Sequence, residues 1–144
     1  LAELIELYGG SGLLAKILKP FFNKIKVVES NSHATELGKQ LLPDAQFYNS
    51  TVDIFLENHA KDLRAKASES LMIINPPRKG CSDQVLESLI KAGSAYLIYI
   101  SCNPNTLARD LKKLRQDYQI VSVQGFDMFP QTNHFETLVL MMKN

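Results

Sequence analysis

The chain has 144 residues, of which 45% are hydrophobic and 22% charged, values typical of one globular domain. Its net charge of +1 neither indicates nor excludes a nucleic-acid partner, and its two cysteines lack the CxxC spacing of a zinc ribbon or an iron–sulfur cluster. We therefore expect a cytoplasmic domain in a reducing compartment, with no membrane segment and no metal site of its own; the oligomeric state is not predicted.

The first residues lack the basic region and cleavage site of a signal peptide, so we expect none. Because the chain begins with Leu1 rather than Met, we expect a piece of a longer protein. Apolar runs predict seven strands, at 4–8, 25–29, 45–49, 71–75, 95–101, 118–126 and 135–143. Helical spacing predicts five helices, at 11–22, 30–42, 52–66, 82–92 and 103–116. Pro20 should end or kink the first helix, and Ile54, Phe55 and Leu63 should be core contacts of the third.

This alternation of strands and helices, closed by two successive strands, predicts one α/β domain over residues 1–144. The sheet should be doubly wound, seven-stranded and mostly parallel, with an antiparallel last strand. Ligands of such sheets bind at the carboxyl ends of the strands. The turn that follows each strand is therefore the place to look for chemistry.

The first two of these turns suggest a nucleotide-type cofactor. YGGSG at 8–12 allows the backbone to approach a ligand closely, and Glu29 follows about twenty residues later at the end of the second strand. An acid in that position accepts hydrogen bonds from ribose hydroxyls. An ordinary turn and a solvated glutamate are the alternative interpretation.

Two further turns carry candidate substrate groups. In NPPR at 75–78, the prolines make a rigid loop, Asn75 offers an amide, and Arg78 suits a phosphate. In SCNPNT at 101–106, Cys102 lies at a strand tip before a helix whose N-terminus favours a thiolate. The sequence alone leaves Cys102 open as a nucleophile or a core residue, whereas Cys81 is interpreted as structural.

The loop at 127–136 supplies two more candidates. Glu136 is an acid near the start of an otherwise apolar strand, where it suits a general base. His134 is a site residue or a satisfied loop histidine. Basic residues recur at 109–115 (Arg109, Lys112, Lys113 and Arg115), either as solvated helix faces or as a patch for a polyanion.

Four motifs, in the order ELYGGSG, NPPRKGCS, SCNPNTLARDL and DMFPQTNHFETLVL, together resemble the RNA uracil-5-methyltransferases over essentially the whole chain. This resemblance implies a class I, Rossmann-like methyltransferase fold. It also implies transfer of a methyl group from S-adenosylmethionine to carbon 5 of a uridine in transfer or ribosomal RNA, with S-adenosylhomocysteine as the second product.

The resemblance further assigns roles by motif position. Cys102 is implied as the nucleophile that adds to carbon 6, and Glu136 as the base that removes the carbon-5 proton. Phe129 would form an apolar wall of the site. The implied cofactor-binding residues are Tyr8, Gly10, Gly12, Glu29 and Asn75. The implied substrate-binding residues are Asn75, Pro76, Arg78, Asn103 and His134.

The chain departs from the family pattern at Asn75, where an Asp is usual, and at Gly9, where a Cys is usual. Family members also carry an upstream RNA-binding portion, which in some holds a metal cluster, so we expect a C-terminal fragment with weak or absent activity alone. Two alternatives stay open. One is a class I methyltransferase for another substrate, and the other is a non-catalytic RNA-binding domain.

Overall fold

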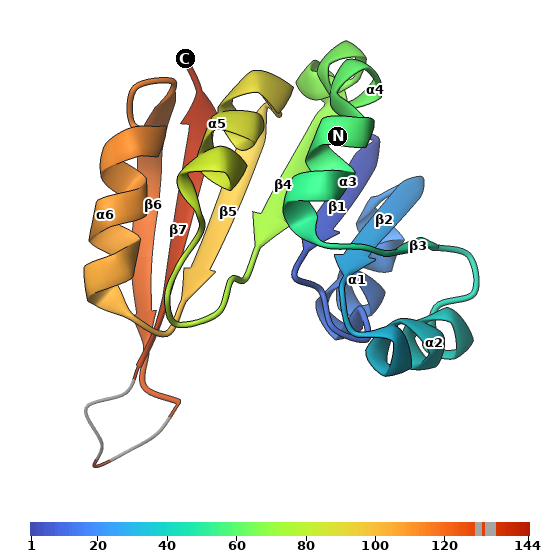
Figure 1. Cartoon of the computed structure of the whole chain (residues 1–144). Coiled ribbons are helices and arrows are strands. Elements are labelled where there is room, and N and C mark those ends of the chain that lie inside the picture. Colours follow the sequence, from blue (N-terminus) through green and yellow to red (C-terminus); the bar gives the residue numbers. More distant parts are fainter. Residues whose placement is uncertain (129–130, 132–134) are drawn as a thin grey trace.

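The structure, a computed structural model, describes residues 1–128, 131 and 135–144. Its centre is one sheet of seven strands in the order β3-β2-β1-β4-β5-β7-β6 (Figure 1). The strands are β1 (Glu3–Leu7), β2 (Lys24–Glu29), β3 (Gln46–Asn49), β4 (Ser70–Ile74), β5 (Tyr96–Ser101), β6 (Tyr118–Phe126) and β7 (Glu136–Lys143). The first five pair in parallel, and β7 runs antiparallel to both β5 and β6. The predicted sheet is confirmed.

Helices cover both faces of this sheet, as its alternating apolar residues require (Figure 1). The helices are α1 (Leu13–Leu18), α2 (Ser32–Leu41), α3 (Val52–Asn58), α4 (Ala60–Ala65), α5 (Asp83–Ala92) and α6 (Pro104–Leu114), with short 3-10 turns at Lys19–Phe21 and Ala67–Glu69. Ile5 and Leu7 of β1 belong to the core with α3 to α6, whereas Leu4 belongs to a second core with α1. Successive residues of β1 therefore point to opposite faces of the sheet and pack into two separate cores.

The ends of the helices follow from local sequence. Ser82, the predicted cap of α5, accepts a hydrogen bond from the backbone N–H of Val85 at 3.3 Å. Asn103 caps α6, and Pro104 follows at the first helical position, where its missing N–H costs nothing. Helix α1 ends before Pro20, which lies in the 3-10 turn, as predicted.

The single helix predicted at 52–66 is wrong, because the chain forms α3 and α4 with a break at His59. The Nδ1 atom of His59 lies 2.9 Å from the carbonyl oxygen of Phe55, and the two rings stack with centroids 4.4 Å apart. The predicted core contacts Phe55 and Leu63 are buried, but Ile54 is 50% exposed, and Leu56 takes its place in the core. The inward face therefore includes Phe55 and Leu63 as predicted, and only Ile54 was wrongly assigned to it.

None of the helices in the described part of the chain is both long and apolar enough to cross a membrane.

Candidate active site

Cys102 and Glu136 lie next to the same end of one antiparallel ladder. The last pair in register between β5 and β7 is Ser101 with Thr137; Cys102 follows β5 in a bend, and Glu136 is the first residue of β7. Both residues are half-buried, and both lie at the end of this ladder, at the carboxyl edge of β5.

Strand alternation also assigns these two residues a face. The pairs Tyr99–Val139 and Leu97–Met141 belong to the core with α5 and α6. The pair Ile100–Leu138 points to the opposite face, and Glu136, two residues before Leu138 in β7, continues its alternation. Glu136 thus lies on the side of the sheet away from α5 and α6, whereas Cys102 lies in the bend after β5, where strand alternation no longer applies.

A cleft of about 340 Å³ opens at the same edge of the sheet, between the ends of β1, β2 and β3 and the loop after β4. Its size is that of a small-molecule site. It is lined by Tyr8, Val28, Glu29, Ser30, Ser50, Thr51, Val52, Asp53, Pro77, Lys79, Gly80, Ser82 and Val85.

Glu29, which lines this cleft, also forms a hydrogen bond with the glycine turn. One carboxylate oxygen of Glu29 accepts the backbone N–H of Gly10 at 2.9 Å, and the other accepts that of Asn31 at 2.7 Å. Gly10 has φ of +56°, a conformation that favours glycine. Because a carboxylate has about four acceptor sites, Glu29 can still accept hydrogen bonds from a ligand.

Tyr8 carries backbone strain of the kind found at functional sites. Its φ is +58° although it is not glycine. Burial, followed by the neighbouring Cys81, raises the pKa of its hydroxyl. Cys81 is 4% exposed, and burial raises the pKa of its thiol to about 12, so the thiol is neutral and packs as a core group.

The predicted cofactor residues are only partly gathered in the cleft. Tyr8 and Glu29 line it, and Gly10 reaches it through Glu29, whereas Gly12 and Asn75 are not among its lining residues. The sequence analysis missed Ser50, Thr51, Asp53, Pro77 and Lys79. The turn after the third strand was the available signal, because Thr51 and its neighbours follow that strand directly. The Thr51 hydroxyl, by hydrogen bonding, lowers the pKa of Asp53.

The 75–82 loop, NPPRKGCS, separates the cleft from α6. Its residues Pro77, Lys79, Gly80 and Ser82 line the cleft. Asn75 and Arg78 are exposed and Pro76 is buried. The side chain of Asn103 donates from Nδ2 to the carbonyl oxygen of Arg78 at 3.1 Å, and its Oδ1 accepts the N–H of Asn105.

His134 and Phe129 of the predicted site lie outside the described residues.

A buried carboxylate that the sequence analysis did not identify lies beneath the glycine turn. Glu6 of β1 is 4% exposed and accepts the backbone N–H of Ala15 at 3.0 Å. Burial raises the pKa of Glu6 from 4.5 to about 7. A Cβ atom at Gly9 would lie 2.6 Å from Cγ1 of Val27, so the glycine present here fits this turn better than a larger residue would.

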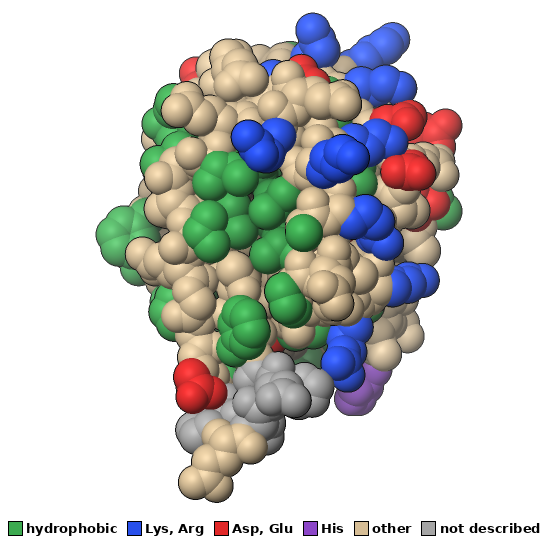
Figure 2. Space-filling view, turned by 90° about the vertical axis from the view of Figure 1, so that its left-hand side faces the viewer, with side chains coloured by type: hydrophobic (Ala, Val, Ile, Leu, Met, Phe, Trp, Pro, Cys, Tyr) green, Lys and Arg blue, Asp and Glu red, His purple; other side chains and the backbone are tan. Residues whose placement is uncertain are grey.

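Two of the four candidate basic residues at 109–115 are engaged in ion pairs. Lys113 contacts Asp83 and Glu87, and Arg109 contacts Asp110. Figure 2 shows the side of the molecule that carries α6 and β6, where Lys and Arg side chains flank an apolar patch. A groove there is lined by Ala108, Leu111, Lys112, Arg115, Gln116 and Ile120. No group of three or more potential metal ligands occurs within the described residues.

Comparison with known proteins identifies relatives of the whole chain. It is 37% identical to an uncharacterised RNA methyltransferase of Protochlamydia amoebophila over 147 residues, which cover 98% of the chain and 33% of that protein. It is 34% identical to an uncharacterised RNA methyltransferase of Listeria innocua, covering 97% of the chain and 31% of the relative. The chain thus spans about a third of the length of these relatives.

Solved structures agree with this result. The Pyrococcus abyssi tRNA (uracil-54, C5)-methyltransferase, solved with S-adenosyl-L-homocysteine, superposes with a TM-score of 0.81 at 27% identity, over 99% of this chain and 34% of that one. The N-methyltransferase NodS of Bradyrhizobium japonicum superposes with a TM-score of 0.75 at 12% identity, over 99% and 85% of the two chains, which is evidence of fold alone. These likenesses confirm the predicted class I methyltransferase fold.

The model of the tRNA (uracil-5-)-methyltransferase family matches residues 55–144, which include the 75–82 loop, Cys102 and Glu136. The chain therefore belongs to the tRNA (uracil-5-)-methyltransferase family.

Proposed function

We propose that this chain is the catalytic domain of an S-adenosylmethionine-dependent RNA methyltransferase that acts on carbon 5 of a uridine. The observation that carries the proposal is the placement of Cys102 and Glu136 at the same end of one ladder, at the carboxyl edge of the sheet where the cleft lined by Glu29 also opens. A thiol and a carboxylate, neighbours at the edge of an α/β sheet, are a suitable pair for covalent chemistry on a pyrimidine. Family membership supports the same reaction.

The chemistry explains why both groups are needed. Carbon 5 of uracil is a poor nucleophile, so the Cys102 thiolate first forms a bond to carbon 6 and pushes the ring electrons into an enolate. S-adenosylmethionine supplies an electrophilic methyl group for carbon 5 and is left as S-adenosylhomocysteine. The Glu136 carboxylate then takes the proton from carbon 5, the carbon 5–carbon 6 double bond re-forms, and the thiolate leaves carbon 6.

We assign the cofactor to the 340 Å³ cleft, where Tyr8 and Glu29 would contact it. Glu29 would accept hydrogen bonds from the ribose, as the acid at the end of a second strand does in nucleotide-binding sheets. Gly10 and Gly12 would keep the turn close to the methionine part, and Asn75 would lie between cofactor and base. The Pyrococcus neighbour, which binds S-adenosyl-L-homocysteine, supports this assignment.

The 75–82 loop would contact the target base, which must leave its stack to reach the edge of the sheet. The amide of Asn75 both donates and accepts, which suits the edge of a uracil. Arg78 is exposed and suits a phosphate. Pro76, Asn103 and His134 complete the proposed substrate set.

The RNA itself would be recognised largely outside this chain, which spans about a third of its relatives. The Pyrococcus neighbour acts on uracil 54 of tRNA, and we extend to this chain only the carbon-5 chemistry, on transfer or ribosomal RNA. The 144 residues alone should therefore bind cofactor but form little product.

The test uses a hybrid protein, in which these 144 residues replace the matching stretch of the Protochlamydia relative. The hybrid and the chain alone are incubated with RNA and with S-adenosylmethionine labelled in its methyl group, and digested nucleosides are separated. Label in 5-methyluridine supports the proposal. Label in another nucleoside or in protein would assign a different substrate, and RNA binding without any labelled product would indicate a non-catalytic domain.

A further inference from the structure

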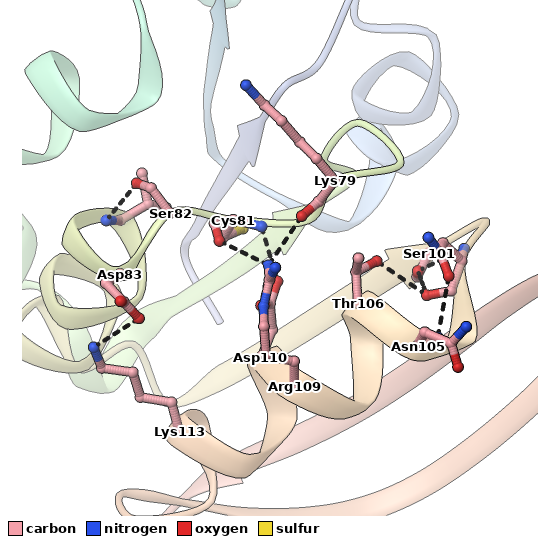
Figure 3. A network of polar contacts seen from close by, with 12 residues as sticks. Lys79, Cys81, Ser82, Asp83, Ser101, Asn105, Thr106, Arg109, Asp110 and Lys113 are labelled. Carbon is pink, nitrogen blue, oxygen red and sulfur yellow. Dashed lines mark hydrogen bonds and ion pairs between the residues drawn. The ribbon is translucent and has the colours of Figure 1, made fainter.

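We infer that Thr106, Arg109 and Asp110 of α6 are positioning residues, which hold the 75–82 loop in a fixed place relative to Cys102. This inference rests on the proposed function, because it names what aligns the thiol with the cofactor cleft. These side chains lie in the stretch TLARDL, whose composition is that of an ordinary amphipathic helix. Figure 3 shows Arg109 and Asp110 reaching the loop at Lys79 and Cys81, although the Arg109 side chain is also partly exposed to solvent.

The loop is held by its main chain. The hydroxyl of Thr106 lies 3.0 Å from the carbonyl oxygen of Arg78 and 3.2 Å from that of Asn103, and it can donate its single hydrogen to either, the shorter contact being to the loop. The carbonyl oxygens of Lys79 and Cys81 both accept Nη2 of Arg109, at 2.9 Å and 3.1 Å. Two side chains one turn apart on α6 therefore fix three carbonyl groups of the loop, whatever its side chains are.

Asp110 anchors the arrangement from inside the core, where it is 0% exposed. One of its carboxylate oxygens accepts the backbone N–H of Cys81 at 2.8 Å and the hydroxyl of Tyr99 at 2.5 Å. Its other oxygen accepts Nε of Arg109 at 2.9 Å. This one carboxylate thus joins the loop, β5 and α6, and its buried charge is compensated by Arg109 and by these donors.

Gly80 shows how closely the loop and the helix approach. Its φ is +74°, and a Cβ atom there would lie 2.6 Å from Oδ2 of Asp110 and 2.7 Å from Nη2 of Arg109. Both contacts are shorter than real Cβ atoms tolerate. The loop therefore reaches the Arg109–Asp110 pair only because this position has no side chain.

The position of this loop bears directly on the proposed reaction. On one side Pro77, Lys79 and Gly80 line the cleft, and on the other side the same loop is bound to α6. Cys102 immediately precedes Asn103, the cap of that helix. The thiol therefore directly precedes α6, and the first two turns of the same helix fix the cleft wall, which sets the distance between thiol and cofactor.

The test compares Thr106→Val, which keeps the shape but loses the hydroxyl, with Thr106→Ser, which keeps the hydroxyl. Arg109→Lys removes the forked contact to two carbonyls and keeps the charge. Lys112→Ala is the matched control, because Lys112 is exposed on α6 and forms no hydrogen bond to the 75–82 loop among the described residues. Each substitution is made in the hybrid protein.

For each variant the single-turnover rate of 5-methyluridine formation is measured at saturating RNA and cofactor, beside the unfolding midpoint. The rate of hydrogen exchange at the Cys81 amide, measured in Asp110→Asn, reports how firmly the hydrogen bond from this N–H to residue 110 holds the loop. We expect faster exchange in Asp110→Asn and a rate lower by roughly one to two orders of magnitude in Thr106→Val and Arg109→Lys. Thr106→Ser and Lys112→Ala should keep the wild-type rate.

The inference is overturned if Thr106→Val and Arg109→Lys methylate at the wild-type rate, or if only their unfolding midpoints fall. It is also overturned if Thr106→Ser loses as much rate as Thr106→Val. A wild-type hybrid that forms no 5-methyluridine would instead refute the proposed function, and the inference would fall with it even if the exchange result stood.

Discussion

Cys102 and Glu136 leave the ladder between β5 and β7 together, each one residue beyond the Ser101–Thr137 pair. They are 34 positions apart in the chain, and only the antiparallel return of β7 brings them to the same end of one ladder. In the proposed reaction one forms the bond to the base and the other allows it to break. Replacing each of the two residues should therefore stop the reaction at a different step.

Replacing the thiol should abolish the reaction and leave the fold intact. Cys102→Ala in the hybrid protein is expected to form no 5-methyluridine, because no other group can add to carbon 6, while its affinity for S-adenosylhomocysteine by calorimetry stays unchanged. Cys81→Ala is the matched control. It should keep the activity but lose about 1 kcal/mol of stability, since Cys81 is packed in the core. Full activity of Cys102→Ala would exclude it as the nucleophile.

Replacing the base should instead trap the intermediate. In Glu136→Gln, the Cys102 thiolate is expected to add to carbon 6 of a uridine in ordinary RNA, and carbon 5 should receive the methyl group. The product should then be released very slowly, because the amide cannot take the carbon-5 proton. A protein–RNA complex that survives denaturation should accumulate, visible as a shifted band. If Glu136→Gln turns over like the wild type, another group is the base.

Replacing Glu29 should weaken cofactor binding. Glu29→Ala removes both the acceptor proposed for the ribose and the hydrogen bond to Gly10. Hydrogen bonds to charged groups contribute about 1.5–3 kcal/mol, so we expect a Kd for S-adenosylhomocysteine roughly ten- to a hundredfold higher. Glu36→Ala, which changes an exposed acid on α2, is the control for calorimetry. Equal affinities for the two variants would place the cofactor elsewhere.

Glu6 should make stability depend on pH. Burial raises its pKa from 4.5 to about 7, so between these values the folded protein holds a proton that the unfolded chain has released. Its contribution to the free energy of unfolding must therefore fall as the pH rises through this window, by about 3 kcal/mol in total. Above pH 7 the loss is complete.

Urea unfolding at pH 5 and pH 8 tests this expectation with Glu6→Gln, which keeps an acceptor for the N–H of Ala15. The variant should gain stability relative to the wild type as the pH rises. Parallel pH curves for the two proteins would contradict the assigned burial effect.

The order of strands and helices was predictable because it follows from the spacing of apolar residues within each segment. Runs such as LMIIN and YLIYIS are almost wholly apolar, so both faces of the strand carry apolar side chains, as is typical of a strand covered on both sides. The break at His59 was not predictable in the same way. It depends on a ring that packs on Phe55 and Tyr48 after the chain has folded.

The site was predictable as a set of strand ends, but its internal geometry was not. Cys102 and Glu136 stand out as polar residues beside apolar strands, yet their register follows only from the pairing of β5 with β7. Arg109 looked like part of a solvated basic face. Its contacts with the carbonyl oxygens of Lys79 and Cys81 join segments about 30 residues apart, which no local pattern encodes.

The most direct test of the proposed mechanism is a search for the covalent intermediate itself. The hybrid protein is mixed with S-adenosylmethionine and an RNA that carries fluorine at carbon 5 of its uridines. Because fluorine cannot leave as a proton, the reaction should stop after methyl transfer, and mass spectrometry should find the methylated RNA bound to the peptide with Cys102. No such adduct, in a protein that still binds the cofactor, would contradict the proposed covalent mechanism.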